Sequence, residues 1–350
     1  MAERQWTASD FDYPLPDSLI AQAPEGARGT SRLLVFRRGT GTDAPGTLDD
    51  QHFGDLPSLM DAGDLLVLNS TRVRHARCVG TRPGGGAAEV LLIHPGVGER
   101  WIAMGKPGRA MQPGKRIILG PGAEIETVAV LDDGMREVRF VGLDATEAIA
   151  RFGQLPLPPY ITRKPTADDE RRYQTVYAER EGSVAAPTAG LHFTDELLAT
   201  LTTAGITIAR LDLEVGPGTF RPVETEAITE HVMHAERFEI PASLAQAVAD
   251  CRLRGGRVWA VGTTVVRALE SAAIGGGQVS AGAAETRLMI TPGFTFQVVD
   301  RLITNFHLPR STLLMLVSAF AGHSATMRAY QHAVAQHYRF YSYGDAMCIL

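Results

Sequence analysis

The sequence has few cysteines and no long apolar run, and each shortage excludes a class of protein. Only Cys78, Cys251 and Cys348 are present, and none is within a C-x-x-C spacing of another, so neither a disulfide framework nor a cysteine-based zinc site is expected. The longest apolar runs, 65–68 and 313–317, are far shorter than the roughly 20 residues that a membrane-spanning helix needs. The N-terminal segment has no apolar signal-peptide core. We therefore expect a globular protein of the cytoplasm that does not enter a membrane.

The common nucleotide, hydrolase and metal motifs are also missing. No P-loop, G-x-G-x-x-G turn or G-x-S-x-G elbow occurs, so neither a bound nucleotide cofactor nor a serine nucleophile is indicated. The histidines of Glu230–His234 stand three apart with the glutamate outside them, which does not fit a zinc-protease motif. We read Gly216–Thr219 as a rigid turn. The sequence therefore predicts no metal and no cofactor.

Lysine is scarce as well, and the chain is acidic overall. Three lysines stand against 31 arginines, and the formal net charge is −5. A generic nucleic-acid coat is excluded, because non-specific phosphate binding needs a broad positive surface. A local basic patch remains compatible with this charge, and arginine suits bidentate contacts to phosphate.

The pattern of the chain changes twice, which predicts a discontinuous domain with an insertion. Residues 74–150 carry five short strand patterns separated by turn residues, and Asp132-Asp133-Gly134 is a strong hairpin signal. The expected strands are 89–93, 101–104, 116–119, 125–131 and 136–141. Residues 1–73 and 151–350 alternate between strands and helices. We predict an α/β protein whose larger domain, 1–73 and 151–350, has an open sheet, with a small β-barrel domain inserted at 74–150.

Hydrophobic periodicity and capping residues predict the elements of the larger domain. The expected strands are 65–68, 206–213, 258–261, 288–290, 302–305 and 338–343. The expected helices are 195–204, 241–252, 263–273, 311–321 and 325–336. Residues 69–72 read as a polar turn after the first of these strands.

Two stretches place small or polar residues next to expected helix N-termini. In 184–194, Gly190 lets a ligand approach the backbone closely, and His192 lies two residues before a helix N-cap, where the helix dipole favours a neutral imidazole. In 258–267 a strand, a small turn and a helix aim free N–H groups at an anion or at hydroxyls. A packed histidine in a tight loop and an ordinary capped helix are the alternatives, and both stay open.

Two later stretches bring further polar and aromatic groups. In 304–312 polar side chains follow a strand end, and ligands of open α/β sheets bind at such ends. In 338–347 aromatic residues crowd beside Asp345, and an aromatic face such as that of Tyr341 suits a planar base. Core packing explains most such aromatic clusters, so this interpretation competes with a purely structural one.

Together these segments closely resemble the S-adenosylmethionine:tRNA ribosyltransferase-isomerases of queuosine biosynthesis. The matching segments follow one another in order along nearly the whole chain. They are 11–13, 19–22, 31–33, 63–65, 71–73, 155–161, 172–177, 185–193, 262–264, 305–309 and 341–347. The resemblance implies a larger α/β domain with an inserted β-barrel, which is also the division indicated by the sequence pattern.

The resemblance also implies a reaction. The family moves the ribosyl carbons of S-adenosylmethionine onto the aminomethyl group of 7-aminomethyl-7-deazaguanine in the wobble position of tRNA, and it releases adenine and methionine. The product is epoxyqueuosine-tRNA, and S-adenosylmethionine is a consumed substrate rather than a cofactor. Because a sulfonium acidifies the neighbouring C5′, one positioned base of near-neutral pKa is enough to start the rearrangement.

This resemblance assigns candidate roles to the polar residues. His192 or His307 is the candidate base, and Asp345 or Glu214 would orient it or exchange protons. The turn from Gly262 to Arg267 would hold the methionine carboxylate or the ribose. The candidate substrate-binding residues are Thr188, Gly190, Gly262, Thr263, Thr264, Arg267, Asn305 and Tyr341.

Transfer RNA must meet positive surface, and two regions offer it. Residues 100–116 contain no acidic residue, and Arg109, Lys115 and Arg116 are the candidate RNA contacts there. Arg172 belongs to a second basic segment. A solvated charged face is the competing interpretation for both regions. We expect the protein to act as a monomer.

A few positions depart from the family pattern and leave the acceptor open. The family usually has a histidine where Glu214 stands and an acidic or amide residue where Ser70 stands, and Arg74-His75 replaces a more apolar pair. A second hypothesis is therefore a paralogue that performs the same sulfonium chemistry on a small-molecule amine. A third is a non-catalytic tRNA-binding module, which the polar residues at predicted strand ends disfavour.

Overall fold

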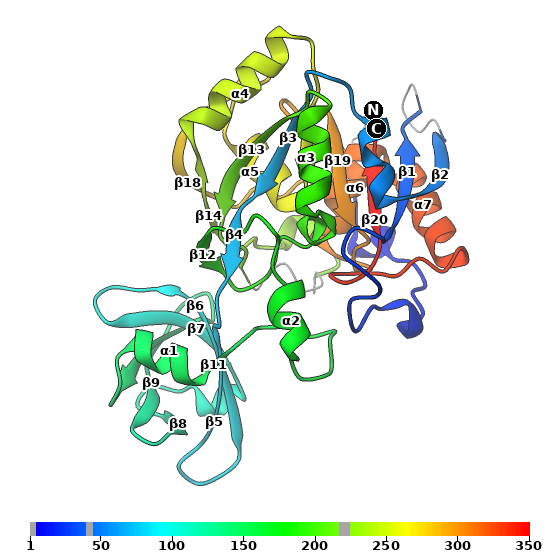
Figure 1. Cartoon of the computed structure of the whole chain (residues 1–350). Coiled ribbons are helices and arrows are strands. Elements are labelled where there is room, and N and C mark those ends of the chain that lie inside the picture. The colour runs from blue at the N-terminus through cyan, green and yellow to red at the C-terminus, as the bar shows by residue number, and fades with distance from the viewer. Residues whose placement is uncertain (1–4, 40–44, 217–224) are drawn as a thin grey trace.

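The chain, seen here as a computed structural model, is described over residues 5–39, 45–216 and 225–350. Two large sheets, of nine and seven strands, organise it (Figure 1). Most of the expected rigid turn at Gly216–Thr219 lies outside the described residues. Within the described ranges no helix is long and apolar enough to cross a membrane.

The nine-stranded sheet is mixed, with a parallel centre. Its order is β18 (Gly282–Thr286), β14 (Glu236–Ile240), β13 (Thr207–Leu213), β3 (Leu65–Asn69), β15 (Val258–Val261), β19 (Arg301–Asn305), β20 (Ala346–Ile349), β1 (Arg32–Arg37) and β2 (Thr47–His52). Neighbours among β13, β3, β15 and β19 run parallel, whereas β20 runs antiparallel to β19 and parallel to β1. The carboxyl ends of β3, β15 and β19 therefore meet at one edge, where ligands of such sheets bind.

Both faces of the middle of this sheet are covered, which explains why β1, β3 and β15 are almost continuously apolar and buried. In β3, Leu65 and Val67 join one core while Leu66 and Leu68 join another on the opposite face. The first core is completed by α4 (Ala242–Leu253), α5 (Thr263–Ser271), α6 (Thr312–Ala321) and α7 (His323–Ala335). The second is completed by α3 (Asp195–Thr203), whose N-cap Thr194 accepts from the Leu197 N–H as the sequence predicts.

The seven-stranded sheet has its own core and lies apart from the larger sheet (Figure 1). Its order is β11 (Gly153–Gln154), β5 (Arg77–Thr81), β6 (Ala87–Pro95), β7 (Arg100–Lys106), β10 (Arg136–Val141), β9 (Ala123–Val130) and β8 (Arg116–Gly120). β8 also pairs back to β5, with Thr81 opposite Ile118. All five strands predicted between 89 and 141 are confirmed, and α1 (Ala145–Phe152) follows them. The mixed α/β class is confirmed.

Three expected elements are wrong. Instead of a polar turn at 69–72, Asn69 ends β3 and β4 (Thr71–Val73) pairs with β12 (Arg180–Ser183), because the polar groups of this stretch find buried partners. No strand forms at 288–290. After α5 the chain instead makes the hairpin of β16 (Ala273–Gly275) and β17 (Gln278–Val279) and then β18.

The third error concerns 338–343. Aromatic residues favour strands, but here the chain turns at Tyr341, whose φ is +72°, and the aromatic rings fill the core around Phe306. Only Phe340 makes a single bridge, to Ile20.

Candidate active site

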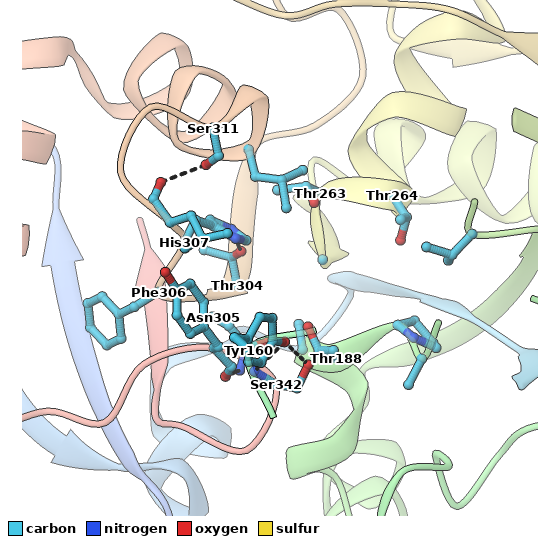
Figure 2. A pocket seen from close by; sticks show the side chains of 18 residues that line it. Tyr160, Thr188, Thr263, Thr264, Thr304, Asn305, Phe306, His307, Ser311 and Ser342 are labelled. Carbon is cyan, nitrogen blue, oxygen red and sulfur yellow. Dashed lines mark hydrogen bonds between the residues drawn. The ribbon is translucent and has the colours of Figure 1, made fainter. Parts of the chain in front are cut away.

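A cavity lies where β15 and β19 end, and it brings together most of the predicted substrate-binding residues (Figure 2). It is lined by segments from five parts of the chain: residues 186–189, 262–264, 304–308, Ser311 with Leu313, and 341–342, together with Tyr160 and Val215. Thr188, Gly262, Thr263, Thr264, Asn305, His307 and Tyr341 are among the lining residues. Its described walls combine apolar residues with the polar side chains of threonine, serine, asparagine, tyrosine and one histidine, and none of these carries a formal charge apart from the histidine if protonated.

Gly262 shapes one side of the cavity. It joins β15 to α5 with φ +90° and ψ 154°, a conformation that strains any residue with a Cβ. The turn directs Thr263 and Thr264 into the cavity at the N-terminus of α5, where backbone N–H groups lack helical partners (Figure 2). The Oγ1 of Thr264 is buried and has no hydrogen-bond partner within the described ranges. Such an atom calls for a ligand or a water.

The Asn305 side chain is held in one orientation. Its Nδ2 donates to the Tyr341 carbonyl at 3.1 Å and lies 3.5 Å from the Asp345 carbonyl. Turning the amide over would set its oxygen against two carbonyl oxygens, so the assignment of Nδ2 is unambiguous. Oδ1 is left buried with no hydrogen-bond partner among residues 5–39, 45–216 and 225–350. The cavity therefore has an unused acceptor at the end of β19.

His192 is the partner that completes this arrangement. Its Nε2 lies 3.1 Å from Asn305 Nδ2, which can only donate, so Nε2 must accept. The ring proton is then on Nδ1, 2.7 Å from Ser31 Oγ, and the ring stacks on Phe53 at 5.0 Å. Burial, assisted by the nearby Arg28 charge, lowers the pKa of His192 to about 4. The neutral imidazole agrees with the sequence prediction, but burial rather than a helix dipole is its main cause.

His307 lies inside the cavity and is fixed by its backbone. Its carbonyl accepts from the Tyr13 hydroxyl at 2.5 Å, and its N–H donates to the Tyr330 hydroxyl at 3.0 Å. The ring Nε2 lies 2.8 Å from Thr304 Oγ1, and Nδ1 has no partner among the described residues. Burial lowers the pKa of His307 to about 3, so the ring is neutral at pH 7. This value is well below the near-neutral pKa expected of the base.

Two stacked tyrosines form the remaining wall. The rings of Tyr160 and Tyr341 lie 4.5 Å apart at 27°, and the Tyr160 hydroxyl bonds to Ser342 Oγ. The Tyr341 hydroxyl is buried without a partner, and burial raises its pKa. The stacked pair presents an aromatic surface of the kind that suits a planar base.

Other predicted residues do not line this cavity. Arg267 donates to Glu236 and to the Leu288 carbonyl, so its charge is neutralised in the core. Gly190 packs so closely that a Cβ there would lie 2.1 Å from the Tyr177 hydroxyl, which gives it a packing role. Neither residue is positioned to contact a ligand in the cavity.

The two predicted carboxylates also lie elsewhere. Glu214 lines a separate surface groove, although its neighbour Val215 reaches the cavity. The Asp345 carboxylate accepts from the backbone N–H groups of Arg32 at 2.9 Å and Arg339 at 2.8 Å, and burial raises its pKa. Asp345 thus fixes the loop that carries Tyr341 and faces a neighbouring cleft.

The predicted RNA contacts differ in how much charge they offer. Arg116 pairs with Glu124 and Glu126 on the adjacent strand β9. Arg109 and Lys115 are exposed and make no ion pair among the described residues. Arg172 ends α2 (Ala167–Arg172), and its guanidinium donates to the Gly26 carbonyl at 3.0 Å.

Several cavity residues were missed as individual contacts. Tyr160 and Ser342 belong to segments that carry the family resemblance, and so does Ser31, which lies outside the cavity and contacts His192. The resemblance of these segments was the signal that could have identified them. Thr304 and Ser311 belong to the polar stretch after β19 that the sequence analysis singled out as a whole. Within the described ranges, no group of three or more histidine, cysteine or acidic residues is placed to hold a metal ion.

Comparison with known proteins places the chain in a family. A family model described as queuosine biosynthesis protein matches residues 8–349. S-adenosylmethionine:tRNA ribosyltransferase-isomerase of Thiobacillus denitrificans is 50% identical over 97% of this chain and 96% of its own length. The protein of that name from Cupriavidus metallidurans is 51% identical, with 98% of both chains covered.

A solved structure agrees with the sequence relatives. The crystal structure of the S-adenosylmethionine tRNA ribosyltransferase from Thermotoga maritima is 34% identical and matches 98% of this chain and 100% of its own, with a TM-score of 0.56. The fold and the near-complete coverage both agree. The chain belongs to the family of S-adenosylmethionine:tRNA ribosyltransferase-isomerases.

Proposed function

We propose that this chain transfers and isomerises the ribosyl moiety of S-adenosylmethionine onto the aminomethyl group of 7-aminomethyl-7-deazaguanine in tRNA. The products are epoxyqueuosine-tRNA, adenine and methionine. Family membership supports this reaction, and the observation that carries it is the cavity itself. Three buried polar atoms of its lining, Thr264 Oγ1, Asn305 Oδ1 and the Tyr341 hydroxyl, have no hydrogen-bond partner among the described residues. They are available to a ligand rich in hydroxyl and amino groups.

His307 is the base in this proposal. If its Nε2–H donates to Thr304 Oγ1, the Nδ1 lone pair is free to take the proton from C5′ of the donor, and the electron pair left on that carbon is stabilised by the adjacent sulfonium. The low pKa of His307 makes it a weak base, so the acidity that the sulfonium gives to C5′ carries much of the step. No cofactor is needed, because the donor is itself consumed.

His192 and Asn305 have positioning and binding roles. The Nε2 lone pair of His192 is already occupied by Asn305, so His192 is not free to take a proton from the substrate. By holding Nδ2 it aims Asn305 Oδ1 for an N–H donor, which the acceptor's aminomethyl group and the donor's amino groups both provide. Thr263 and Thr264, with the free N–H groups of α5, take the carboxylate or ribose role first assigned to the whole turn through Arg267.

The seven-stranded sheet is proposed to act as the inserted β-barrel domain at 74–150, closed by the pairing of β5 with β8. Arg109 and Lys115 on this domain would contact tRNA, because their charge is not neutralised within the described residues, whereas that of Arg116 is. We place the enzyme in the cytoplasm as a monomer that acts without a membrane. Its exposed large apolar side chains, such as Val97, Val232 and Leu253, are scattered along the chain.

One assay tests the function and separates the acceptors. Adenine release from S-adenosylmethionine is measured with tRNA that carries the aminomethyl-deazaguanine, with bulk tRNA that lacks it, and with the free base. Release only with the modified tRNA supports the proposal. Release with the free base alone would identify the small-molecule paralogue. Tight binding of tRNA with no adenine release and no affinity for S-adenosylmethionine would identify a non-catalytic binding module.

A further inference from the structure

A second cleft, of about 510 Å³, lies beside the cavity. The two share Ser342 in their walls, and the floor of the second cleft includes Ser31 and His192, the pair that anchors Asn305 at the end of β19. Arg28 and Arg172 lie on its wall. The side chains of His192 and Asn305 would therefore separate a group bound in the second cleft from a ligand in the first.

The acidic groups of the cleft are already occupied. Glu25 pairs with Arg339 at 3.1 Å, and both oxygens of Asp345 accept backbone N–H groups. Arg32, also on the wall, pairs with Asp50 at 3.5 Å and stacks on Tyr338. The carboxylates of Glu25 and Asp50 are therefore paired with other arginines, and Asp345 is held by backbone N–H groups rather than by Arg28 or Arg172.

Arg28 and Arg172 are the cations left unbalanced. Arg28 donates only to the carbonyls of Leu191 and Arg171, both at 3.0 Å, and Arg172 only to the Gly26 carbonyl. No carboxylate of the described residues lies within ion-pair distance of either. Burial lowers the pKa of Arg28, and the nearby charge of Arg172 lowers it further. Two adjacent guanidinium groups that repel each other in a concave site favour a bound anion.

We propose that Arg28 and Arg172 bind a phosphate of the RNA backbone next to the nucleotide that reacts in the cavity. This inference rests on the proposed function for the identity of the RNA. The forked geometry of a guanidinium matches the oxygens of a phosphate. A backbone phosphate held in this cleft would fix the position of the RNA strand, so that the neighbouring base enters the cavity beside Tyr341. Such a phosphate site would let a protein of negative net charge bind RNA, because Arg28 and Arg172 concentrate positive charge where the strand must be positioned.

The donor's carboxylate is the other possible source of an anion, and the structure favours the phosphate. The cavity already offers the N-terminus of α5 with Thr263 and Thr264 to a carboxylate. His192 and Asn305 stand between the cavity and the cleft, so a donor that fills the first would have to pass this pair to reach Arg172.

Arg172→Gln is the main test, and Arg171→Gln is its matched control. Both variants remove one charge from α2, but the Arg171 side chain is 80% exposed and pairs with Asp168, outside the cleft. Binding of fluorescently labelled modified tRNA is measured by anisotropy over a range of salt, and binding of S-adenosylmethionine by calorimetry. Arg172→Lys and thermal melting curves show whether lost binding reflects lost charge or lost structure.

We expect Arg172→Gln to weaken RNA binding about tenfold and to reduce the slope of log K against log salt by about 1, with unchanged donor affinity. Arg172→Lys should keep most of the slope. Equal losses in Arg171→Gln and Arg172→Gln, or lost donor affinity with intact RNA binding, would each overturn the proposal. The anisotropy measurement of RNA binding does not require the enzyme to turn over. If wild-type protein binds RNA but releases no adenine, the proposed reaction fails while the phosphate site stands.

Discussion

The cavity and the arginine cleft are separated by one histidine–asparagine pair, yet they differ in almost every physical property. The cavity is lined by neutral side chains, and its unpaired polar atoms are single acceptors and hydroxyls. Four arginines contribute to the cleft, and two of them, Arg28 and Arg172, make no ion pair with a carboxylate in the part of the chain that the structure describes. Neutral groups in a buried site act through short, directional hydrogen bonds, whereas exposed charges act at longer range and are screened by salt. The reaction in the cavity thus depends on short hydrogen bonds, whereas the placement of the RNA depends on charge interactions.

The largest effect should come from the base. His307→Gln removes the Nδ1 lone pair from the cavity while keeping a polar side chain of similar length. We expect kcat for adenine release to fall by about 10²- to 10⁴-fold, the usual contribution of a general base, with RNA affinity unchanged. Single-turnover assays with saturating modified tRNA measure it. If RNA affinity fell instead, the separation between cavity and cleft would be wrong.

Acid should lower the free energy of unfolding through the two buried histidines at the cavity. His192 and His307 have pKa values below the ordinary 6.5, so the unfolded chain binds more protons than the folded one as the pH falls through 6.5. The free energy of unfolding should therefore drop between pH 7 and pH 5, by on the order of 1–2 kcal/mol for each histidine. The lowered pKa of Asp169 destabilises the fold only at lower pH, below its ordinary 3.8.

Urea unfolding at pH 7 and pH 5 checks this, with His192→Gln as the matched variant. Removing one of the two titrating rings should roughly halve the change. An identical change in the variant would show that folding leaves the pKa of His192 at its ordinary value.

A smaller effect is expected at His192 itself. Glutamine can offer its Oε1 near the position of Nε2 and still accept from Asn305, so His192→Gln should keep kcat within about tenfold of wild type. His192→Ala removes the acceptor and should lose roughly 1–3 kcal/mol, or about 5- to 150-fold, in kcat/KM. The ratio of kcat/KM between the two variants measures how much the acceptor at position 192 contributes by orienting Asn305. Inactivity of both to the level of His307→Gln would make His192 the base instead.

The smallest effect is expected on the seven-stranded sheet. Arg116 is neutralised by Glu124 and Glu126, so Arg116→Gln should change RNA affinity by less than about twofold and leave its salt dependence unaltered. Lys115→Gln, which removes an exposed charge next to it, is the comparison variant and should weaken binding more. The reverse order would show that the ion pairs of Arg116 open when RNA binds.

Local patterns predicted the elements well where one effect dominated. Leu65–Leu68 is buried on both faces and forms the expected strand, and Thr194 caps the expected helix. The pattern failed at 338–343, because aromatic residues that favour strands also fill cores around a turn. At 69–72, polar residues that favour turns were satisfied by partners over 100 residues away.

The site was predictable as a set of segments but not as a set of contacts. Gly262, Asn305 and His307 stand at strand ends, a position readable from periodicity alone. Arg267 does not line the cavity because it pairs with Glu236, which lies 31 residues away on a different element. No local sequence signal predicts that ion pair. Likewise, nothing in the sequence shows that Asn305 occupies the Nε2 of His192.

The position of β20 has a consequence for how the molecule is made. Leu33 of β1 lies opposite Ala346 of β20, and β20 alone connects the β1–β2 pair to β19 and the rest of the sheet. During synthesis, the earliest strands must wait for residues more than 300 positions later before their neighbour exists. Assembly of the edge that carries Asn305 and Tyr341 is therefore a late, long-range event, and the chain gains its reactive pocket only when nearly all of it has been translated.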